Sequence, residues 1–328
     1  MRPRRASYDR RIAVPRPVPP VPRSWSLPIA YAVYARPDPE LIETSPDAVE
    51  LSPLAPGAAV LEDQADGAFE QITVLAPPGV LERRYVLAQT LRVLASGGRL
   101  AALAPKDKGG SRLAKELAGF GCAPEESARR HHRFCDAVRP DRPEGLEAAI
   151  AAGAPQVVPA LGLWSQPGVF SWDRADPGSA LLLRNLPPLA GVGADFGCGV
   201  GLLARAVLQS PAVNRLSLID IDRRAVEAAR RNIDDVRADF AWRDLRAGDR
   251  LENLDFVVMN PPFHDRGEED RGLGAAFIRA AAAALKPKGV CWLVANRHLP
   301  YEALLTPLFP RARQVVQADG YKVYEARR

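Results

Sequence analysis

Short apolar runs alternate with segments of helical periodicity along most of the chain. In the second half, strand-like apolar runs lie at residues 193–196, 216–221, 255–259 and 290–295. Helical segments separate these runs, at residues 202–208, 224–233 and 275–285. Strands that alternate with helices form βαβ units, and buried parallel strands read as continuous apolar runs. The pattern therefore predicts a doubly wound α/β fold, with a parallel sheet covered by helices on both faces.

The first half carries a weaker version of the same pattern. Strand-like runs at residues 72–75 and 99–103 flank a helical segment at residues 84–94, which is again a βαβ order. A break rich in Pro, Asp and Arg follows at residues 140–143, and 328 residues are more than one core usually accommodates. We expect two domains. The predicted parts are a disordered tail at residues 1–24, a first domain at residues 25–140, a linker at residues 141–165 and a second domain at residues 166–328.

The two halves share an order of elements. In residues 69–100 and again in residues 254–291, a strand ends at a Pro-Pro pair and is followed by a helix, a glycine turn and a second strand. The first copy has Ala76 where the second has Asn260, and no glycine-rich turn precedes it. This predicts a duplicated fold whose N-terminal copy is degenerate. A chance match between two βαβ units is the alternative.

Composition excludes several classes of protein. Apolar residues make up 47% and charged residues 25% of the chain, which is ordinary globular usage. The four cysteines include no CxxC pair, so we expect neither a disulfide framework nor a zinc ribbon. His131, His132 and Cys135 have no second ligand pair nearby in the sequence, and we expect no metal. No apolar run reaches the ~20 residues of a membrane span, which predicts a cytoplasmic protein without a membrane partner.

The net charge of +5 is concentrated in the N-terminal tail. Residues 1–24 contain seven arginines, six prolines and a single acidic residue, Asp9, so the tail carries +6 and the other 304 residues carry −1. Such a segment cannot bury enough apolar surface to fold alone. It is suited to salt-dependent attraction to RNA phosphates, with a merely solvated extension as the alternative.

A glycine-rich turn follows the first strand of the second half. Asp195, Gly197, Gly199 and Gly201 form a D-x-G-x-G pattern that opens a helix, and Asp220 ends the next strand. Glycines allow a ligand to approach the backbone, and a carboxylate about 20 residues further on can accept hydrogen bonds from ribose hydroxyls. The pattern is typical of class I S-adenosylmethionine (SAM) methyltransferases, and a nicotinamide or flavin dinucleotide is the weaker alternative because G-x-G-x-x-G is incomplete.

Two further segments fit a SAM site. Asp244 follows a short strand-like run and is a candidate acceptor for the adenine amino group, or else an ordinary helix cap. Asp176 and Ser179 open an apolar helix. Either residue could be a simple N-cap, or the segment, with Ser179, approaches the methionine end of the cofactor.

The motif Asn260-Pro261-Pro262-Phe263 ends a strand, which is where open α/β sheets bind ligands. The exocyclic amine of a base is a poor nucleophile, because its lone pair is delocalised into the ring. The Asn260 oxygen and the Pro261 carbonyl could accept its two hydrogens and stabilise the charge that develops on the nitrogen. Pro262 would stiffen the loop, and Phe263 would stack on the base. The alternative is a strand-ending turn capped by Asn260.

These motifs resemble the bacterial ribosomal RNA guanine-N2 methyltransferases, and most closely their two-domain small-subunit group of the 16S guanine-1207 type. The resemblance rests on Asn260-Pro-Pro-Phe-His-Asp265, on Pro167-Gly-Val-Phe-Ser171 and on Tyr321-Lys-Val-Tyr324, and it continues more weakly through residues 87–130. It implies a class I SAM methyltransferase that modifies guanine N2 in 16S rRNA of the small ribosomal subunit. It also implies a non-catalytic first domain that supports folding and RNA binding.

Other functions share parts of this pattern. A large-subunit (23S) rRNA guanine-N2 methyltransferase, an adenine-N6 methyltransferase and a protein glutamine-N5 methyltransferase could all present Asn-Pro-Pro-aromatic to a planar amine. A non-catalytic RNA chaperone could keep the fold without the chemistry. The intact glycine turn and the intact Asn260 motif argue against the chaperone.

Overall fold

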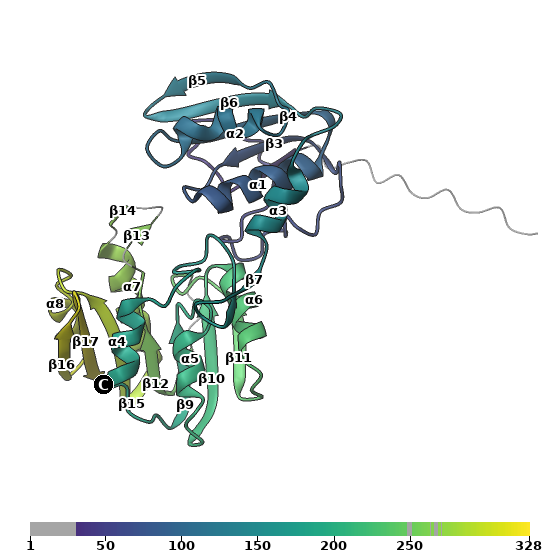
Figure 1. The fold of residues 1–328 in the computed structure, drawn as a ribbon. Helices are drawn as coiled ribbons and strands as arrows, with labels where there is room; N and C mark the ends of the chain where they lie inside the picture. Colours follow the sequence, from purple (N-terminus) through teal and green to yellow (C-terminus); the bar gives the residue numbers. More distant parts are fainter. Residues whose placement is uncertain (1–30, 248–250, 263, 266–267, 270) are drawn as a thin grey trace, which may run out of the picture.

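The computed structural model describes residues 31–247, 251–262, 264–265, 268–269 and 271–328. They form two α/β domains, drawn one above the other in Figure 1. The tail of residues 1–24, and the roles expected of it, lie outside the described residues. Among the described residues, no helix combines the length and the apolar composition that a membrane crossing requires.

The first domain is built on a six-stranded sheet of order β2-β1-β3-β4-β6-β5. The strands β2, β1, β3 and β4 are parallel, and β6 and β5 continue the sheet in antiparallel pairs. Its elements are β1 (Tyr31–Tyr34), β2 (Val49–Glu50), β3 (Phe69–Leu75), α1 (Val80–Val93), β4 (Leu94–Pro105), η1 (Gly110–Arg112), α2 (Leu113–Ala118), β5 (Glu125–Arg129), β6 (His132–Val138) and α3 (Leu146–Gly153). The expected βαβ unit is therefore present as β3, α1 and β4.

Helix α3 packs against the first domain, although the sequence placed it in the linker of residues 141–165. Ala149 is buried in the same hydrophobic core as the α1 residues, and Leu146 and Ile150 pack against that core. Gly153 lies so close to α1 that a Cβ there would be 2.3 Å from the Cβ of Tyr85. The packed core of the first domain thus extends to Gly153, because the alanine-rich face of α3 is apolar and needs a partner.

A short hairpin, β7 (Gln156–Val158) and β8 (Leu163–Ser165), connects the domains. The second domain has a seven-stranded sheet of order β11-β10-β9-β12-β15-β17-β16. Its elements are α4 (Pro177–Asn185), β9 (Gly191–Phe196), α5 (Leu202–Val207), β10 (Val213–Asp220), α6 (Arg223–Asn232), β11 (Ala238–Trp242), β12 (Leu254–Met259), β13 (His264–Asp265), β14 (Glu268–Glu269), α7 (Arg271–Ala284), β15 (Leu285–Asn296), α8 (Glu302–Leu305), β16 (Arg311–Ala318) and β17 (Tyr321–Arg327).

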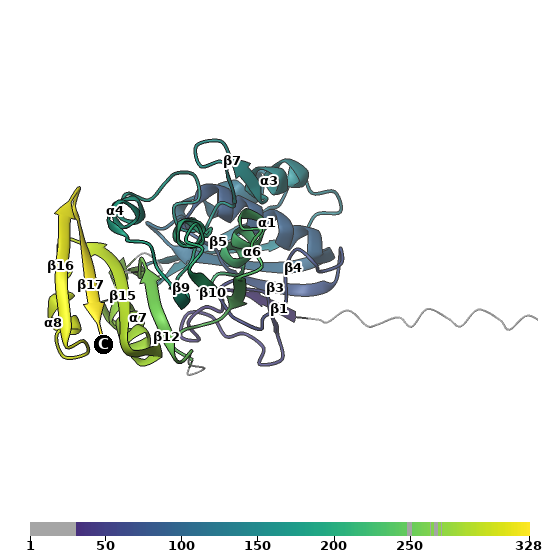
Figure 2. The same ribbon diagram turned by 90° about the horizontal axis from the view of Figure 1, so that it is seen from below.

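Helices cover both faces of this second sheet. One buried cluster joins the sheet to residues of α4, α5 and α6, and another joins it to residues of α7 and α8. Figure 2 shows α4 and α6 on one side of the strands and α7 on the other. The doubly wound fold that the apolar pattern predicted is confirmed.

The two sheets share a strand order, which supports the duplicated fold expected from the sequence. The order β10-β9-β12-β15-β17-β16 in the second domain corresponds to β2-β1-β3-β4-β6-β5 in the first, with the same parallel and antiparallel pairs. The first domain is the reduced copy. Residues 35–48 are described throughout and form turns where the second domain has its glycine-rich turn and α5.

A buried arginine occupies the first copy of the Pro-Pro motif. The guanidinium of Arg83 donates to the carbonyls of Pro77 at 3.2 Å and Pro78 at 2.7 Å, and it pairs in a bidentate manner with Glu116 at 2.7 and 2.8 Å. The Arg83 side chain is only 1% exposed. In this copy the proline carbonyls are hydrogen-bonded within the protein.

Candidate functional site

The candidate site lies where three neighbouring parallel strands of the second domain end. The register pairs Phe196 of β9 with Ile219 of β10 on one side and with Met259 of β12 on the other. The residues that follow these three, and with them the glycine turn, Asp220 and Asn260, therefore emerge at the same level on adjacent strands. This edge is the place where open α/β sheets bind ligands.

The glycine turn has a backbone that only glycine adopts easily. Gly197, Gly199 and Gly201 have φ angles of +71°, +52° and +86°. A Cβ on Gly201 would lie 2.8 Å from Ile233, so this glycine is also required by packing. A Cβ on Gly199 would have no described heavy atom within 4 Å. Gly199 therefore borders open space at the edge of the sheet, as a ligand-binding turn requires.

Asp195 is fully buried at the end of β9. One of its oxygens, Oδ2, accepts a hydrogen bond from the backbone N–H of Ala204 in the first turn of α5, at 3.1 Å. The other, Oδ1, has no hydrogen-bond partner among the described residues. Burial raises the pKa of this carboxyl to about 8. Asp195 thus anchors the helix that follows the glycine turn and keeps one buried acceptor unsatisfied.

Asp220 joins the glycine turn to the start of α6. Its Oδ2 accepts from the backbone N–H of Gly199 at 2.9 Å, and its Oδ1 accepts from the backbone N–H of Asp222 at 2.9 Å. Burial raises the pKa of Asp220 to about 6. A carboxylate has about four lone-pair sites, so both oxygens can still accept from further donors.

Asp244, the residue expected to accept from adenine, is engaged locally. It lies two residues beyond β11, and both of its oxygens accept from the guanidinium of Arg246, at 2.8 to 3.1 Å. The backbone N–H of Arg246 also donates to it at 2.8 Å. These hydrogen bonds lower the pKa of Asp244, so it is ionised. Its role toward adenine stays a prediction.

Asn260 is held by two residues at the start of α4. Its side-chain nitrogen Nδ2 donates to Oδ2 of Asp176 at 2.8 Å and to Oγ of Ser179 at 2.9 Å. A carboxylate only accepts hydrogen bonds, so the nitrogen of the Asn260 amide must face Asp176. This leaves Oδ1 of Asn260 as the acceptor available to a ligand.

The structure describes two of the other three residues of the Asn-Pro-Pro-Phe motif. Pro261 is buried and Pro262 is half-buried. Phe263 lies outside the described residues, so its expected stacking on a base stays a prediction. Ser179, which the sequence assigned to the cofactor, contacts the Asn260 side chain in this structure.

Asp176 is the helix cap that the sequence offered, and it makes a second contact that the sequence did not predict. It is the N-cap of α4, where its Oδ2 accepts from the backbone N–H of Ser179 at 2.6 Å. The same oxygen accepts from Asn260. The Asp-Pro-Gly-Ser segment at residues 176–179 signals the cap, but it carries no sign of a partner 84 residues away.

The histidine and cysteine cluster belongs to a hairpin of the first domain. His131 has a φ of +61° in the turn between β5 and β6, and Cys135 is buried. Within the described part of the chain, no group of three or more His, Cys, Asp or Glu side chains is placed to hold a metal ion.

Comparison with known proteins identifies the same region of the chain. Residues 160–325 match the family model described as the methyltransferase small domain. The "Ribosomal RNA small subunit methyltransferase C" of Pseudomonas aeruginosa is 33% identical over 283 residues, which cover 83% of this chain and 84% of that protein. The protein of the same name from Shewanella loihica is 28% identical over 270 residues, with 79% of this chain and 78% of that protein covered.

A solved structure resembles both domains together. The T. thermophilus 16S rRNA N2 G1207 methyltransferase, solved in complex with AdoMet and guanosine, superimposes with a TM-score of 0.73 at 25% sequence identity. The match covers 91% of this chain and 88% of that one. The likeness therefore includes the two-domain arrangement as well as the sheet that carries the candidate site.

Proposed function

This chain belongs to the ribosomal RNA small subunit methyltransferase C family, and we propose that it transfers a methyl group from SAM to the exocyclic N2 amine of a guanine in 16S rRNA. The observation that carries the proposal is the orientation of Asn260. Its amide nitrogen is committed to Asp176 and Ser179, so its oxygen is the polar atom left for a substrate amine.

The residues at the sheet edge fit a SAM molecule. Gly199 borders open space, Asp220 keeps acceptor capacity for ribose hydroxyls, and Asp195 holds a buried oxygen without a partner. Asp195, Gly197, Gly199, Gly201 and Asp220 are therefore assigned to the cofactor, with Asp244 as the candidate contact to adenine. When bound, SAM supplies a sulfonium methyl group that is open to in-line displacement, so positioning supplies most of the catalysis.

The Asn260 loop is assigned to the guanine. The Asn260 oxygen and the Pro261 carbonyl accept from the two hydrogens of the amine and draw the nitrogen lone pair out of conjugation with the ring. Both acceptors also stabilise the positive charge that grows on nitrogen during transfer. Pro262 fixes the direction of the loop, and Phe263 is assigned to stacking on the base. Ser179 supports this loop through its contact with Asn260.

The first domain is assigned to RNA binding and to support of the catalytic domain. The carbonyls of its Pro-Pro pair accept hydrogen bonds from Arg83, and the segment between β1 and β2 lacks a glycine turn. Both observations argue against a second active site. The basic tail of residues 1–24 is assigned to RNA phosphates. The catalytic domain is assigned to residues 166–328, and a ribosomal substrate supports a cytoplasmic location.

Mass mapping of methylguanosine in both ribosomal RNAs of a strain lacking the gene tests this function. We expect one N2-methylguanosine to disappear from 16S rRNA and to return when the wild-type chain is supplied. An Asn260→Ala chain should not restore it. Loss from 23S rRNA instead would reassign the substrate to the large subunit. Unchanged methylguanosine with a loss of methyladenine or of methylglutamine would reassign the chemistry.

A further inference from the structure

The first domain contacts the second domain beside the candidate ribose carboxylate. Helix α6 begins three residues after Asp220, at Arg223, whose backbone N–H donates to the carbonyl of Pro53 at 2.9 Å. The Arg223 side chain pairs with Glu62 at 2.8 Å. The next residue, Arg224, pairs with Glu82 at the start of α1 at 2.7 Å. The first two residues of α6 thus contact three residues of the first domain: Pro53, Glu62 and Glu82.

The ion pair of Arg224 with Glu82 is largely buried, and further hydrogen bonds of Arg224 lead to the candidate SAM site. The side chains of Arg224 and Glu82 are 5% and 12% exposed. The other guanidinium nitrogens of Arg224 donate to both oxygens of Asp222, at 2.9 and 3.0 Å. Asp222 in turn donates its backbone N–H to Asp220, and Asp220 accepts from Gly199. An unbroken series of hydrogen bonds therefore connects Glu82 of the first domain to the glycine turn.

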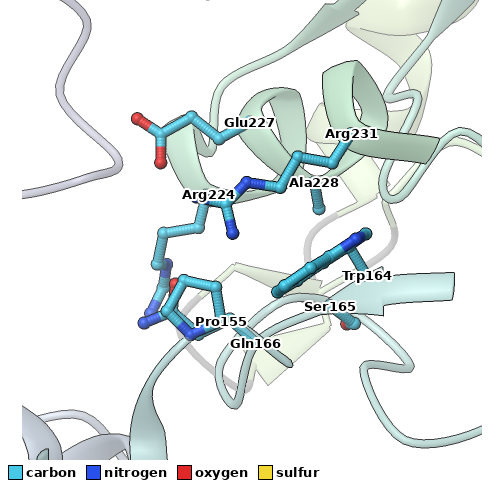
Figure 3. A pocket seen from close by; sticks show the side chains of 8 residues that line it. All are labelled: Pro155, Trp164, Ser165, Gln166, Arg224, Glu227, Ala228 and Arg231. Carbon is cyan, nitrogen blue, oxygen red and sulfur yellow. The ribbon is translucent and has the colours of Figure 1, made fainter. Parts of the chain in front are cut away.

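The connecting segment between the domains closes over this pair. A Cβ on Gly168 would lie 2.4 Å from both the Arg224 guanidinium and the Glu82 carboxylate, so no side chain fits between them. Asn232, at the end of α6, bonds to the backbone of Trp164 and donates to the carbonyl of Val200 within the glycine turn. Arg231 of α6 stacks on the ring of Trp164 of β8, with its guanidinium carbon 4.8 Å from the ring centroid, and Figure 3 shows the Arg224 side chain beside Pro155.

A guanidinium buried to this degree needs both of its carboxylate partners. Loss of one partner leaves a charge that is poorly compensated in a low-dielectric environment, which is costly. Arg224 would then move toward water or draw closer to Asp222, and either movement shifts the residue that donates to Asp220. Asp220 also accepts a hydrogen bond from Gly199, so a shift of Asp220 changes the glycine turn as well as the candidate ribose contact.

We propose that Glu82 is a positioning residue for SAM binding. Through Glu82 the degenerate first domain holds Asp220, the candidate ribose contact of the second domain, in the geometry that binds SAM. This inference rests on the assignment of SAM to the second domain. It gives the first domain a role in cofactor affinity in addition to RNA binding. SAM binding and domain docking are therefore coupled, each strengthening the other.

The test is calorimetric SAM binding and steady-state methylation with the full-length chain and the variant Glu82→Gln. We expect the Kd and the KM for SAM to rise roughly tenfold, within the 5- to 150-fold range of coupled sites, while kcat at saturating SAM stays unchanged. The KM for ribosomal subunits should also stay unchanged. The milder variant Glu62→Gln, which breaks the more exposed pair with Arg223, should shift SAM affinity in the same direction by less.

The matched control is Glu116→Gln, which breaks the pair of Glu116 with Arg83, the residue next to Glu82, entirely within the first domain. It should lower the thermal unfolding temperature as Glu82→Gln does, with SAM affinity at the wild-type value. If Glu82→Gln and Glu62→Gln are both destabilised without a change in SAM affinity, Glu82 only fastens the domains and the proposal is wrong. A wild-type chain that binds SAM but methylates no ribosomal RNA would instead overturn the proposed function.

Discussion

The side-chain nitrogen of Asn260 donates a hydrogen bond of 2.8 Å to Oδ2 of Asp176, the residue that caps helix α4. One carboxylate oxygen thus fixes both the start of a helix and the orientation of the amide that we assign to the substrate. The helix cap and the amine-binding loop therefore share one carboxylate, and substitutions at Asp176 can distinguish its two roles.

Replacement of Asn260 by Ala should remove catalysis and leave SAM binding intact. If the Asn260 oxygen acts mainly as charge develops on the amine, turnover should fall by roughly 10²- to 10³-fold, the scale for one lost transition-state hydrogen bond. Single-turnover methylation of unmodified small subunits, with SAM affinity measured in parallel, checks this. Wild-type turnover in this variant would make Asn260 a structural cap.

Replacement of Asp176 by Ser should separate the cap from the orienting contact. Serine is a good N-cap, so α4 and the thermal stability should be little changed, but its shorter side chain does not reach Asn260. Turnover should drop by up to about 10²-fold, as for a misplaced catalytic group. The control is Asp176→Asn, which keeps an oxygen acceptor for both contacts and should retain most activity. Equal loss in both variants would point to the charge of Asp176 instead.

The affinity for SAM should depend on pH through Asp220. Its pKa is raised to about 6, and ribose hydroxyls donate to the ionised carboxylate, so bound SAM favours the charged form. The affinity contributed by Asp220 should therefore fall as pH decreases through 6, by roughly tenfold per pH unit below that value. Calorimetry between pH 5 and pH 8 measures the profile.

Two variants give the profile its controls. Asp220→Asn should flatten it, because an amide does not titrate in this range. Asp220→Ala should weaken SAM binding by about 1 to 3 kcal/mol at pH 8, the cost of losing hydrogen bonds to a charged group. Unchanged affinity in Asp220→Ala would move the ribose contact to another residue.

Two glycines of the same turn should respond differently to Ala. Both have positive φ, so each substitution costs about 1 kcal/mol of stability or more. Gly201→Ala also forces a Cβ against Ile233 and should show the larger fall in unfolding temperature. Gly199→Ala points its methyl into open space and should show the larger fall in SAM affinity. The reverse order would contradict the placement of SAM beside Gly199.

Deletion of residues 1–24 should lower RNA affinity and flatten its salt dependence. The tail carries +6, and fewer phosphate counterions are released on binding when it is absent. The slope of log affinity against log salt, measured with small subunits, is the readout. An unchanged slope would identify the tail as a solvated extension, and SAM affinity should be unaffected in either case.

The local features of this fold follow from the sequence, because they depend on neighbouring residues. The apolar runs predicted β9, β10, β12 and β15, and the D-x-G-x-G pattern predicted the turn with positive φ. The shared Pro-Pro order predicted two related sheets. Helix α3, which the sequence placed in the linker, packs on the core of the first domain, and an alanine-rich segment carries no sign of the core it will join.

The contacts that orient the site depend on distant residues. Asp176 meets Asn260 across 84 residues, and Glu82 meets Arg224 across 142 residues. Both contacts are set by how strands and domains pack, and neither spacing forms a motif. Asp244 is the opposite case, since its partner Arg246 lies only two residues away and the pair is local.

The buried Arg83 hinders the recovery of an active site in the first domain. Its guanidinium occupies the proline carbonyls of the first copy, so an Ala76→Asn exchange alone would set an amide beside an acceptor that is already taken. Removing Arg83 as well would strand Glu116, its buried partner. A return to two active sites through this motif therefore requires several linked substitutions, and we expect the asymmetry between the two copies to persist as long as Arg83 is in place.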